Sequence, residues 1–376
     1  MTNQLLYRKI EETIRERISN GVYPPGSQLP TEMELIKEFN TSRLTIGKSL
    51  SHLVAEGLIT RTRGRGSFVN GEKKRETPGL IRYISPVASD ENFLLHNRLL
   101  EGVQETVRKA NYNVSIDFYR SAEEETEILR HYKNPENDAF VIWPGNDPQI
   151  IEILKELAGR NFPFVLVDSF FPQLKCNCVM TDNILGGLLV LEHLARLGHR
   201  RVGYLSQPLD RFSLAERFAG TVSAAGSLGI ELLPHTFIQR GTTAQMPQFA
   251  ETVKAEIARW LDSQLQLPEP PTAIFCSNDS LALTLYEILT EKGIKIPEEM
   301  SVAGFDNASF GQYLPIPLTS VEHDFCAIGR EAGKILLNLL QKSAQTAPQL
   351  HYRIAPQLHR RGSTEFHLIG SEVSTR

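Results

Sequence analysis

The sequence has few of the residues that build redox or metal sites. Its 376 residues include only four cysteines, which lie far apart or in one C-x-C pair, with no C-x-x-C pair and matching histidines. This spacing argues against a zinc site, so we expect small buried thiols in a reducing compartment. The four are Cys176, Cys178, Cys276 and Cys326.

Long apolar runs are also missing. No stretch of about 18 apolar residues occurs, so no transmembrane helix is predicted. The segment MTNQLLYRKIEET carries charges and lacks an apolar core, and it therefore does not resemble a signal peptide. We expect a cytoplasmic protein without a membrane partner.

Signatures of common enzyme classes are absent as well. We find no G-x-G-x-x-G after a strand, no Walker A motif and no G-x-S-x-G. His199 has the chemistry of a general base, but it lies in a loop before a predicted strand, where a structural role is favoured. The sequence thus predicts no catalytic residues, no cofactor and no metal.

Charge is distributed unevenly along the chain, although the net charge is only -4. Residues 1–78 hold 13 Lys and Arg against 9 Asp and Glu, a net of +4. The remainder holds 27 basic and 35 acidic residues, a net of -8. A basic N-terminal part on an acidic body is typical of a DNA-binding module attached to another domain.

The first seventy residues predict three short helices and a hairpin. Apolar residues recur at helical spacing from Leu6 to Ile18, and Thr31-Glu32-Met33-Glu34 is a capping-box pattern that opens a second helix. Thr41 or Ser42 caps a third helix, whose inward face comprises Ile46, Leu50, Leu53 and Val54. Extended runs at 58–62 and 67–69 flank a Gly-Arg-Gly turn. This order is that of a winged helix-turn-helix domain.

In such a domain the third helix enters the major groove of double-stranded DNA. Arg43 has the geometry to read guanine, Thr45 to meet phosphate or a thymine methyl, and Lys48 to neutralise phosphate. Arg65, at the tip of the wing, is placed to enter the minor groove. The predicted DNA-binding residues are Thr31, Glu32, Ser42, Arg43, Thr45, Lys48, Arg63, Arg65 and Gly66.

These motifs resemble the DNA-binding head of the GntR family. The resemblance rests on YPPGSQLPTE from Tyr23, Ser42-Arg43, EGLI from Glu56 and GRGSFV from Gly64. Two positions depart from it, because family members often carry Arg at Met33 and Arg or Asn at Gly47. Two DNA contacts that are common in the family are therefore in doubt, and Gly47 is expected to weaken the helix by roughly 1 kcal/mol.

A polar segment at 71–79 predicts a linker, after which strands and helices alternate. Such alternation predicts parallel sheets covered by helices, and its length predicts two α/β lobes. The expected domains are 1–70, the winged helix; 80–365, the ligand-binding domain; and 366–376, a tail. The expected lobes are about 80–180 with 310–348, and about 182–309 with 350–365.

Ligands of open α/β sheets bind beyond the carboxyl ends of the strands. Polar residues follow several predicted strands, among them Ser85, Asp168, Asn278 and Asp306. Each carboxylate alone is more often a cap or turn residue, but together they favour a site. The predicted ligand-binding residues, with aromatics for stacking, are Ser85, Phe93, Asp168, Ser213, Arg217, Asn278, Asp306 and Phe325.

The body resembles the effector domain of the LacI/GalR family over residues 79–365. The matching motifs are TDN at Thr181, LGHRRVGY at Leu197, ERFAG at Glu216, FCSND at Phe275, SVAGFDN at Ser301 and LTSVEHDF at Leu318. The resemblance implies a periplasmic-binding-protein fold, in which Asp168, Arg217, Asn278 and Asp306 grip ligand and Ser213 and Phe325 line the pocket. It also implies three crossing segments, near 180–182, 309–312 and 349–354. A GntR-type head replaces the family's usual one, as in regulators of the arabinose-repressor kind.

We therefore expect a dimeric transcriptional repressor that responds to a small molecule, most simply a sugar. A purine or another metabolite is an alternative effector. A sugar-binding transport component is a rival opposed by the winged helix, and an enzyme is a rival opposed by the missing motifs. The resemblance leaves open whether ligand releases DNA or promotes its binding.

Overall fold

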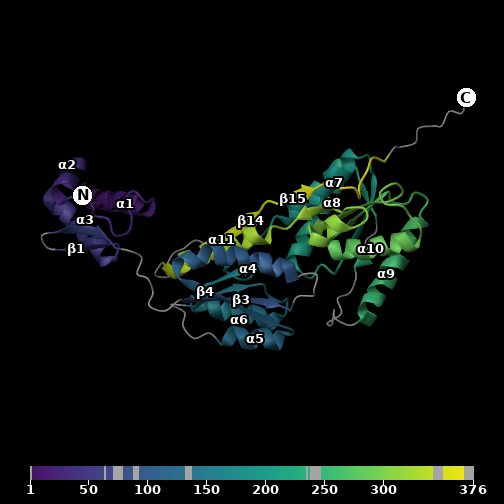
Figure 1. Ribbon diagram of the computed structural model, residues 1–376, viewed down its shortest axis with the longest axis horizontal. Helices are drawn as coiled ribbons and strands as arrows, with labels where there is room; N and C mark the ends of the chain where they lie inside the picture. The colour runs from purple at the N-terminus through teal and green to yellow at the C-terminus, as the bar shows by residue number, and fades with distance from the viewer. Residues whose placement is uncertain are drawn as a thin grey trace, which may run out of the picture. The chain divides into compact units, whose positions relative to one another are not determined.

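The computed structural model describes residues 2–62, 65–70, 79–87, 93–131, 138–233, 236–237, 247–341 and 350–367. The chain forms two compact units, Met1–Thr77 and Pro78–Arg376 (Figure 1). Of the predicted linker, only Gly79 belongs to the described part. No helix in the described ranges combines the length and apolar character needed to span a bilayer.

The first unit is a three-helix domain with a two-stranded antiparallel wing. Its elements are α1 (Thr2–Ser19), α2 (Glu32–Glu38), α3 (Arg43–Ala55), β1 (Ile59–Thr62) and β2 (Gly66–Val69). Ile14, Leu35, Ile46, Leu50 and Leu53 are almost fully buried in its core. The expectation that Val54 faces inward was wrong, since its side chain is 38% exposed.

The caps of α2 and α3 are those that the sequence predicts. The Thr31 hydroxyl accepts from the Glu34 amide at 3.3 Å, and Glu34 Oε2 accepts from the Thr31 amide at 2.7 Å, which completes a capping box. Ser42 Oγ accepts from the Thr45 amide at 3.2 Å. These caps fix where the second and third helices begin, and thus which residues lie at the start of α3.

The second unit contains two lobes, each a sheet covered by helices on both faces. The sheet of the N-lobe is wholly parallel, in the order β14-β7-β6-β5-β3-β4. Its strands are β3 (Gly79–Pro86), β4 (Tyr112–Tyr119), β5 (Asp138–Ile142), β6 (Phe164–Val167), β7 (Asn177–Thr181) and β14 (His351–Ile354). Its helices are α4 (Phe93–Val107), η1 (Arg108–Ala110), α5 (Ala122–Arg130), α6 (Pro148–Gly159) and α11 (Phe325–Gln341).

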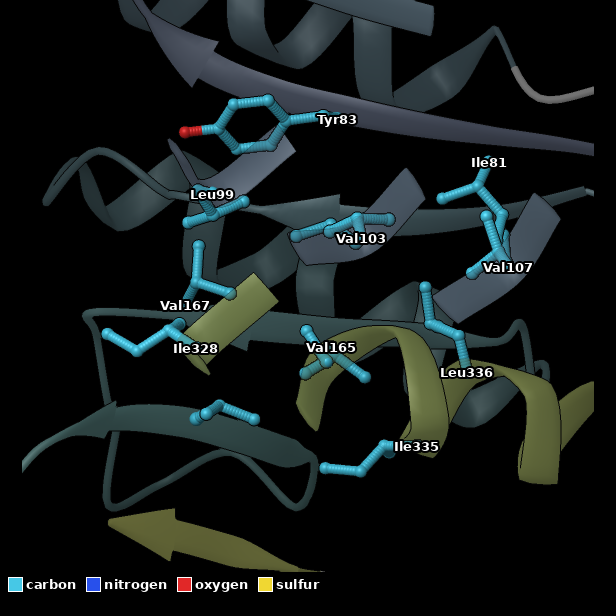
Figure 2. Close-up of a cluster of buried hydrophobic side chains, with 14 of the residues drawn as sticks. Ile81, Tyr83, Leu99, Val103, Val107, Val165, Val167, Ile328, Ile335 and Leu336 are labelled. Atoms are coloured by element: carbon cyan, nitrogen blue, oxygen red, sulfur yellow. The ribbon is translucent and has the colours of Figure 1, made fainter. Parts of the chain in front are cut away.

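Helices α4 and α11 cover one face of this sheet, and α5 and α6 cover the other (Figure 1). Ile81 and Tyr83 of β3 and Val165 of β6 meet the apolar sides of α4 and α11 (Figure 2). The two helices can approach closely because Gly102 of α4 has no Cβ. A Cβ at this position would overlap the carbonyl oxygen of Cys326. This contact joins α11 to the N-lobe although the strand that precedes it, β13, belongs to the C-lobe.

The sheet of the C-lobe has the order β10-β8-β11-β12-β13-β15, with β9 beside β8. Its strands are β8 (Arg201–Ser206), β9 (Glu231–Leu232), β10 (Thr236–Phe237), β11 (Ala273–Cys276), β12 (Ser301–Asp306), β13 (Thr319–Glu322) and β15 (Gln357–His359). Its helices are α7 (Asn183–Arg196), α8 (Phe212–Leu228), α9 (Pro247–Leu265), α10 (Asp279–Glu291) and η2 (Ser309–Tyr313). Among the described strand pairs of this sheet, only β13–β15 is antiparallel.

Two of the expected lobe boundaries need correction. The expected crossing at 309–312 was wrong, because β13 pairs with β12 and the chain leaves the C-lobe only between β13 and α11. The crossing expected at 349–354 is also displaced, because β14 pairs with β7 and the chain returns to the C-lobe between β14 and β15. The crossing at 180–182 is confirmed, since β7 leads directly to α7.

Candidate functional site

Several of the predicted ligand-binding residues lie at the carboxyl ends of parallel strands in the two sheets. Ser85 is the last residue but one of β3, Asp168 directly follows β6, and Asp306 ends β12. Asp168 and Asp306 adopt positive φ values, 49° and 106°. Such backbone is strained for residues other than glycine and is often found at functional sites.

A histidine that the sequence did not single out joins these two carboxylates. His323, on the segment between β13 and α11, places Nε2 3.4 Å from Asp168 Oδ1 and Nδ1 3.7 Å from Asp306 Oδ1. Asp168 and His323 are both buried, and neither Asp168 Oδ1 nor His323 Nε2 has a hydrogen-bond partner among the described atoms. Buried polar atoms without partners are costly, and a bound hydroxyl would satisfy them.

Ser213, the second residue of α8, brings the C-lobe to the same carboxylate. Its hydroxyl lies 3.4 Å from Asp168 Oδ2 and is itself buried. Burial raises the pKa of Asp168, while the charges of His323 and Arg217 oppose that shift. Asp168 is thus a group that a ligand hydroxyl or a nearby cation would stabilise in its charged form. The side chains gathered around Asp168, His323 and Asp306 between the two lobes are called the crevice below.

Arg217 is close enough for its charge to act on Asp168, but it is already engaged within the C-lobe. Its Nη2 donates to Asn183 Oδ1 at 2.9 Å, its Nη1 donates to the carbonyl oxygen of Ser277, and its guanidinium stacks 3.4 Å from the centre of the Phe305 ring. A guanidinium has five N–H donors, so these contacts orient it and leave donors for a ligand.

Two predicted residues have structural partners. Asn278 is the N-cap of α10, and its Oδ1 accepts from the Leu281 amide at 2.9 Å. Ser85 Oγ lies 3.0 Å from His96 Nδ1, which is also 2.7 Å from the hydroxyl of Tyr83. Burial lowers the pKa of His96 to about 4, so this ring is neutral at pH 7.

Aromatic rings form a row along the crevice. Trp143, directly after β5, lies 5.0 Å from His96 and stacks on Phe325 at 5.2 Å between ring centres. Phe325 in turn stacks on His323 at 3.9 Å. The side chain of Phe93, the remaining predicted aromatic, lies outside the described residues. The row places apolar ring faces beside the Asp168–His323–Asp306 group.

His96, Trp143 and His323 are therefore crevice residues that the sequence analysis missed. Trp143 carried the same signal as Asp168, since both directly follow buried strands. His323 lies inside the motif that supplied Phe325. His199 is buried and bonds Thr272 Oγ1 at 2.8 Å and the Glu365 carbonyl at 3.1 Å, which agrees with its expected structural role.

The winged helix presents a second candidate site at the start of α3. Arg43 is 83% exposed and its Nε lies 3.3 Å from Glu32 Oε2, while Arg61 of β1 pairs with the other oxygen of the same carboxylate. Glu32 thus holds two guanidinium groups near the amino end of the recognition helix. Arg61 was not predicted, although it is one of the exposed residues of β1.

The other predicted DNA-binding residues differ in exposure. Lys48 is exposed with its Nζ 4.3 Å from the centre of the Tyr7 ring, and Arg65 and Gly66 are exposed on the wing. Thr45 does not point outward as expected, because its side chain is buried and its hydroxyl lies 2.9 Å from that of Ser42. Thr31 and Ser42 are exposed caps, and Arg63 lies outside the described residues.

Both units match families of known regulatory or binding domains. Residues 6–69 match the model of bacterial regulatory proteins, gntR family. Residues 191–364 match the model of the periplasmic binding protein-like domain. Each match falls within one of the two compact units.

Similarity to individual proteins extends further along the chain. The chain is 28% identical to the arabinose metabolism transcriptional repressor of Geobacillus stearothermophilus, over 92% of this chain and 94% of that protein. It is 29% identical to the transcriptional repressor CytR of Escherichia coli K12, over 71% and 74% of the two chains.

Solved structures share the fold of the larger unit. A LacI family regulator from Enterococcus faecium with bound ribose superposes with a TM-score of 0.61 at 24% identity, over 76% of this chain and 98% of that one. The regulator CelR in complex with cellobiose gives 0.64 at 18% identity, over 86% and 91%. The chain therefore joins a winged-helix domain of the gntR type to a periplasmic-binding-protein-like domain, and over most of its length it is similar to arabinose metabolism transcriptional repressors.

Proposed function

We infer that this protein is a cytoplasmic, ligand-responsive DNA-binding regulator that represses genes of sugar uptake or catabolism. The observation that carries this proposal is the joining of a basic winged helix to a crevice lined by partnerless buried polar atoms. The similarity to arabinose metabolism repressors over 92% of the chain supports it.

The chemistry of the crevice favours a polyhydroxylated ligand. Asp168 and Asp306 are bidentate acceptors for vicinal hydroxyls, Arg217 retains donors, and the partly exposed Trp143 ring can pack against the C–H side of a sugar ring. A ligand that contacts Asp168 in the N-lobe and Arg217 in the C-lobe has different affinities for different lobe arrangements. It therefore shifts the population of those arrangements.

DNA binding rests on the exposed basic residues of the winged helix. Arg43, Lys48 and Arg65 are all exposed, and we expect Arg43 to meet base edges and the other two to meet phosphates or the minor groove. We expect a homodimer whose two heads read a pseudo-palindromic operator. Sedimentation of the full chain between 0.1 and 10 µM tests this expectation, and a monomer throughout that range would contradict it.

Calorimetry on the full chain tests the effector class. L-Arabinose, D-ribose and cellobiose are the sugars to titrate, and hypoxanthine represents the purine alternative. Saturation at about 100 times Kd raises the free energy of unfolding by about 2.7 kcal/mol, so a thermal-shift screen identifies candidates first. We expect binding of at least one sugar and its loss in Asp168→Asn. Binding of the purine alone would replace the sugar in the proposal, and turnover of a bound sugar would contradict the regulator.

A further inference from the structure

One buried carboxylate of the N-lobe has no role in the crevice described above. Glu125, on α5, is completely buried, and both of its oxygens accept from the Gly145 amide, at 3.1 and 3.2 Å. A Cβ at Gly145 would lie 2.8 Å from Glu125 Oε2, so the backbone rests directly on the carboxyl group. The segment that covers Glu125 is the loop between β5 and α6.

That loop, residues 143–147, carries groups that reach the crevice and the other lobe. Trp143 at its start belongs to the aromatic row, and Asn146 Nδ2 donates to the Asp210 carbonyl of the C-lobe at 2.9 Å. Tyr119, at the end of β4, donates to the Trp143 carbonyl at 2.9 Å. Glu125 and Tyr119 together form the surface on which the loop packs, called its seat below. Their contacts with the loop fix the position of the Trp143 ring.

The charge of Glu125 is not compensated in this seat. Within the described part of the chain it forms no ion pair, and the groups that face it are Tyr119 and the like-charged Asp147, while Arg211 acts on Tyr119. Burial, with a smaller contribution from Asp147, raises the pKa of Glu125 to about 7, against the hydrogen bond from the Gly145 amide. The carboxyl group therefore exchanges its proton near neutral pH.

We propose that Glu125 is a positioning residue that couples ligand binding in the crevice to proton uptake. The 143–147 loop can occupy the position described above only while Glu125 is buried beneath it. The proposal rests on the proposed function in one respect, that the crevice binds a ligand. An ionised Glu125 lies more favourably in water than beneath the loop. The neutral acid still accepts the Gly145 amide, although more weakly than the carboxylate does, and it has an O–H to donate.

The sign of the pH dependence follows from the raised pKa of the seated state. At pH values below the usual pKa of a glutamic acid, Glu125 is neutral whether buried or hydrated, and it does not destabilise the buried position of the loop. As pH rises from there toward 7, this position becomes progressively less stable. Ligand affinity therefore falls as pH rises, by at most about tenfold between pH 6 and pH 8 if release of the loop fully hydrates Glu125. The neutral isostere in Glu125→Gln holds the loop at every pH.

Tryptophan fluorescence tests the loop without any ligand. The chain has two tryptophans, and Trp260→Phe leaves Trp143 as the sole reporter. Emission of this variant is expected to titrate with a midpoint near pH 7, and the added change Glu125→Gln is expected to abolish that transition. Glu123→Gln, at an exposed position of the same helix, is the matched control and keeps it.

Calorimetry with L-arabinose and D-ribose at pH 6 and pH 8 tests whether the protonation of Glu125 changes sugar affinity. Wild type is expected to bind the accepted sugar several-fold more weakly at pH 8, whereas Glu125→Gln binds it equally at both and more tightly than wild type at pH 8. A flat fluorescence profile in the single-reporter protein, or an unchanged midpoint in Glu125→Gln, overturns the proposal. If neither sugar binds, the proposed sugar function fails, and the fluorescence result still decides the role of Glu125.

Discussion

Glu216 of α8 and Arg353 of β14 form a bidentate ion pair between the two lobes. Their paired atoms lie 2.6 Å and 2.9 Å apart, and the Glu216 carboxylate is only 10% exposed. The hydrogen bonds that Arg353 donates to Glu216 raise the pKa of the guanidinium. Because α8 also carries Ser213 and Arg217, this pair links β14 of the N-lobe to the helix of the C-lobe that carries two of the predicted ligand-binding residues.

We predict that breaking this pair changes the lobe equilibrium. Glu216→Arg and Arg353→Glu each leave like charges in contact, which is expected to weaken sugar binding by about tenfold or more. The double exchange restores the opposite charges and is expected to recover most of the affinity. Calorimetry of the four proteins measures the coupling, and additive losses in the double variant would show that the pair carries none.

Asp168 offers a test that separates binding from stability. Because burial raises its pKa, the ionised side chain is unfavourable in the empty crevice, and Asp168→Asn is expected to leave the free energy of unfolding at pH 7 unchanged or increased. The same change removes a charged acceptor and is expected to weaken sugar binding by about ten- to 150-fold. Urea denaturation and calorimetry measure the two quantities. A destabilised variant with normal affinity would place Asp168 in a structural role.

Arg43 and Lys48 are expected to differ in what they contribute to DNA binding. Arg43→Ala removes a base-reading group and is expected to cost about 1–3 kcal/mol of discrimination between operator and random DNA. Lys48→Ala is expected to weaken both complexes alike and to reduce the salt dependence. Fluorescence anisotropy on the two duplexes checks this. Equal losses on both duplexes for Arg43→Ala would remove it from base reading.

Two glycines in helices are expected to respond in opposite directions. Nothing lies within 4 Å of a Cβ built at Gly47 in α3, so Gly47→Ala is expected to stabilise the winged helix by about 1 kcal/mol. In Gly102→Ala the new methyl meets the backbone of α11, and we expect a destabilised N-lobe. Thermal unfolding measures both. Destabilisation by Gly47→Ala would mean that α3 is more crowded than its surroundings indicate.

Local patterns predicted the elements better than they predicted the lobes. The capping box of α2, the N-cap of α3, the wing and most strands of the larger unit follow from short-range signals, and Asp168 and Asp306 follow from strand ends. The assignment of β13 to the C-lobe could not be predicted in this way. It depends on the pairing of β13 with β12, which no local pattern encodes. Thr45 was misplaced for a related reason, since its inward rotation depends on the core beneath α3. His323 was missed because its importance arises only when two distant carboxylates converge on it.

The central claim is that a sugar in the crevice controls DNA binding by the winged helix. Its most direct measurement begins with a duplex selected from random DNA by the full chain. Anisotropy then gives the Kd for that duplex with and without the sugar that calorimetry identifies, and Asp168→Asn is the control. We predict a change in Kd of at least about tenfold on saturation with sugar, a coupling of about 1.4 kcal/mol, and no change in Asp168→Asn. A sugar that saturates the crevice and leaves the Kd for DNA unaltered would contradict the account.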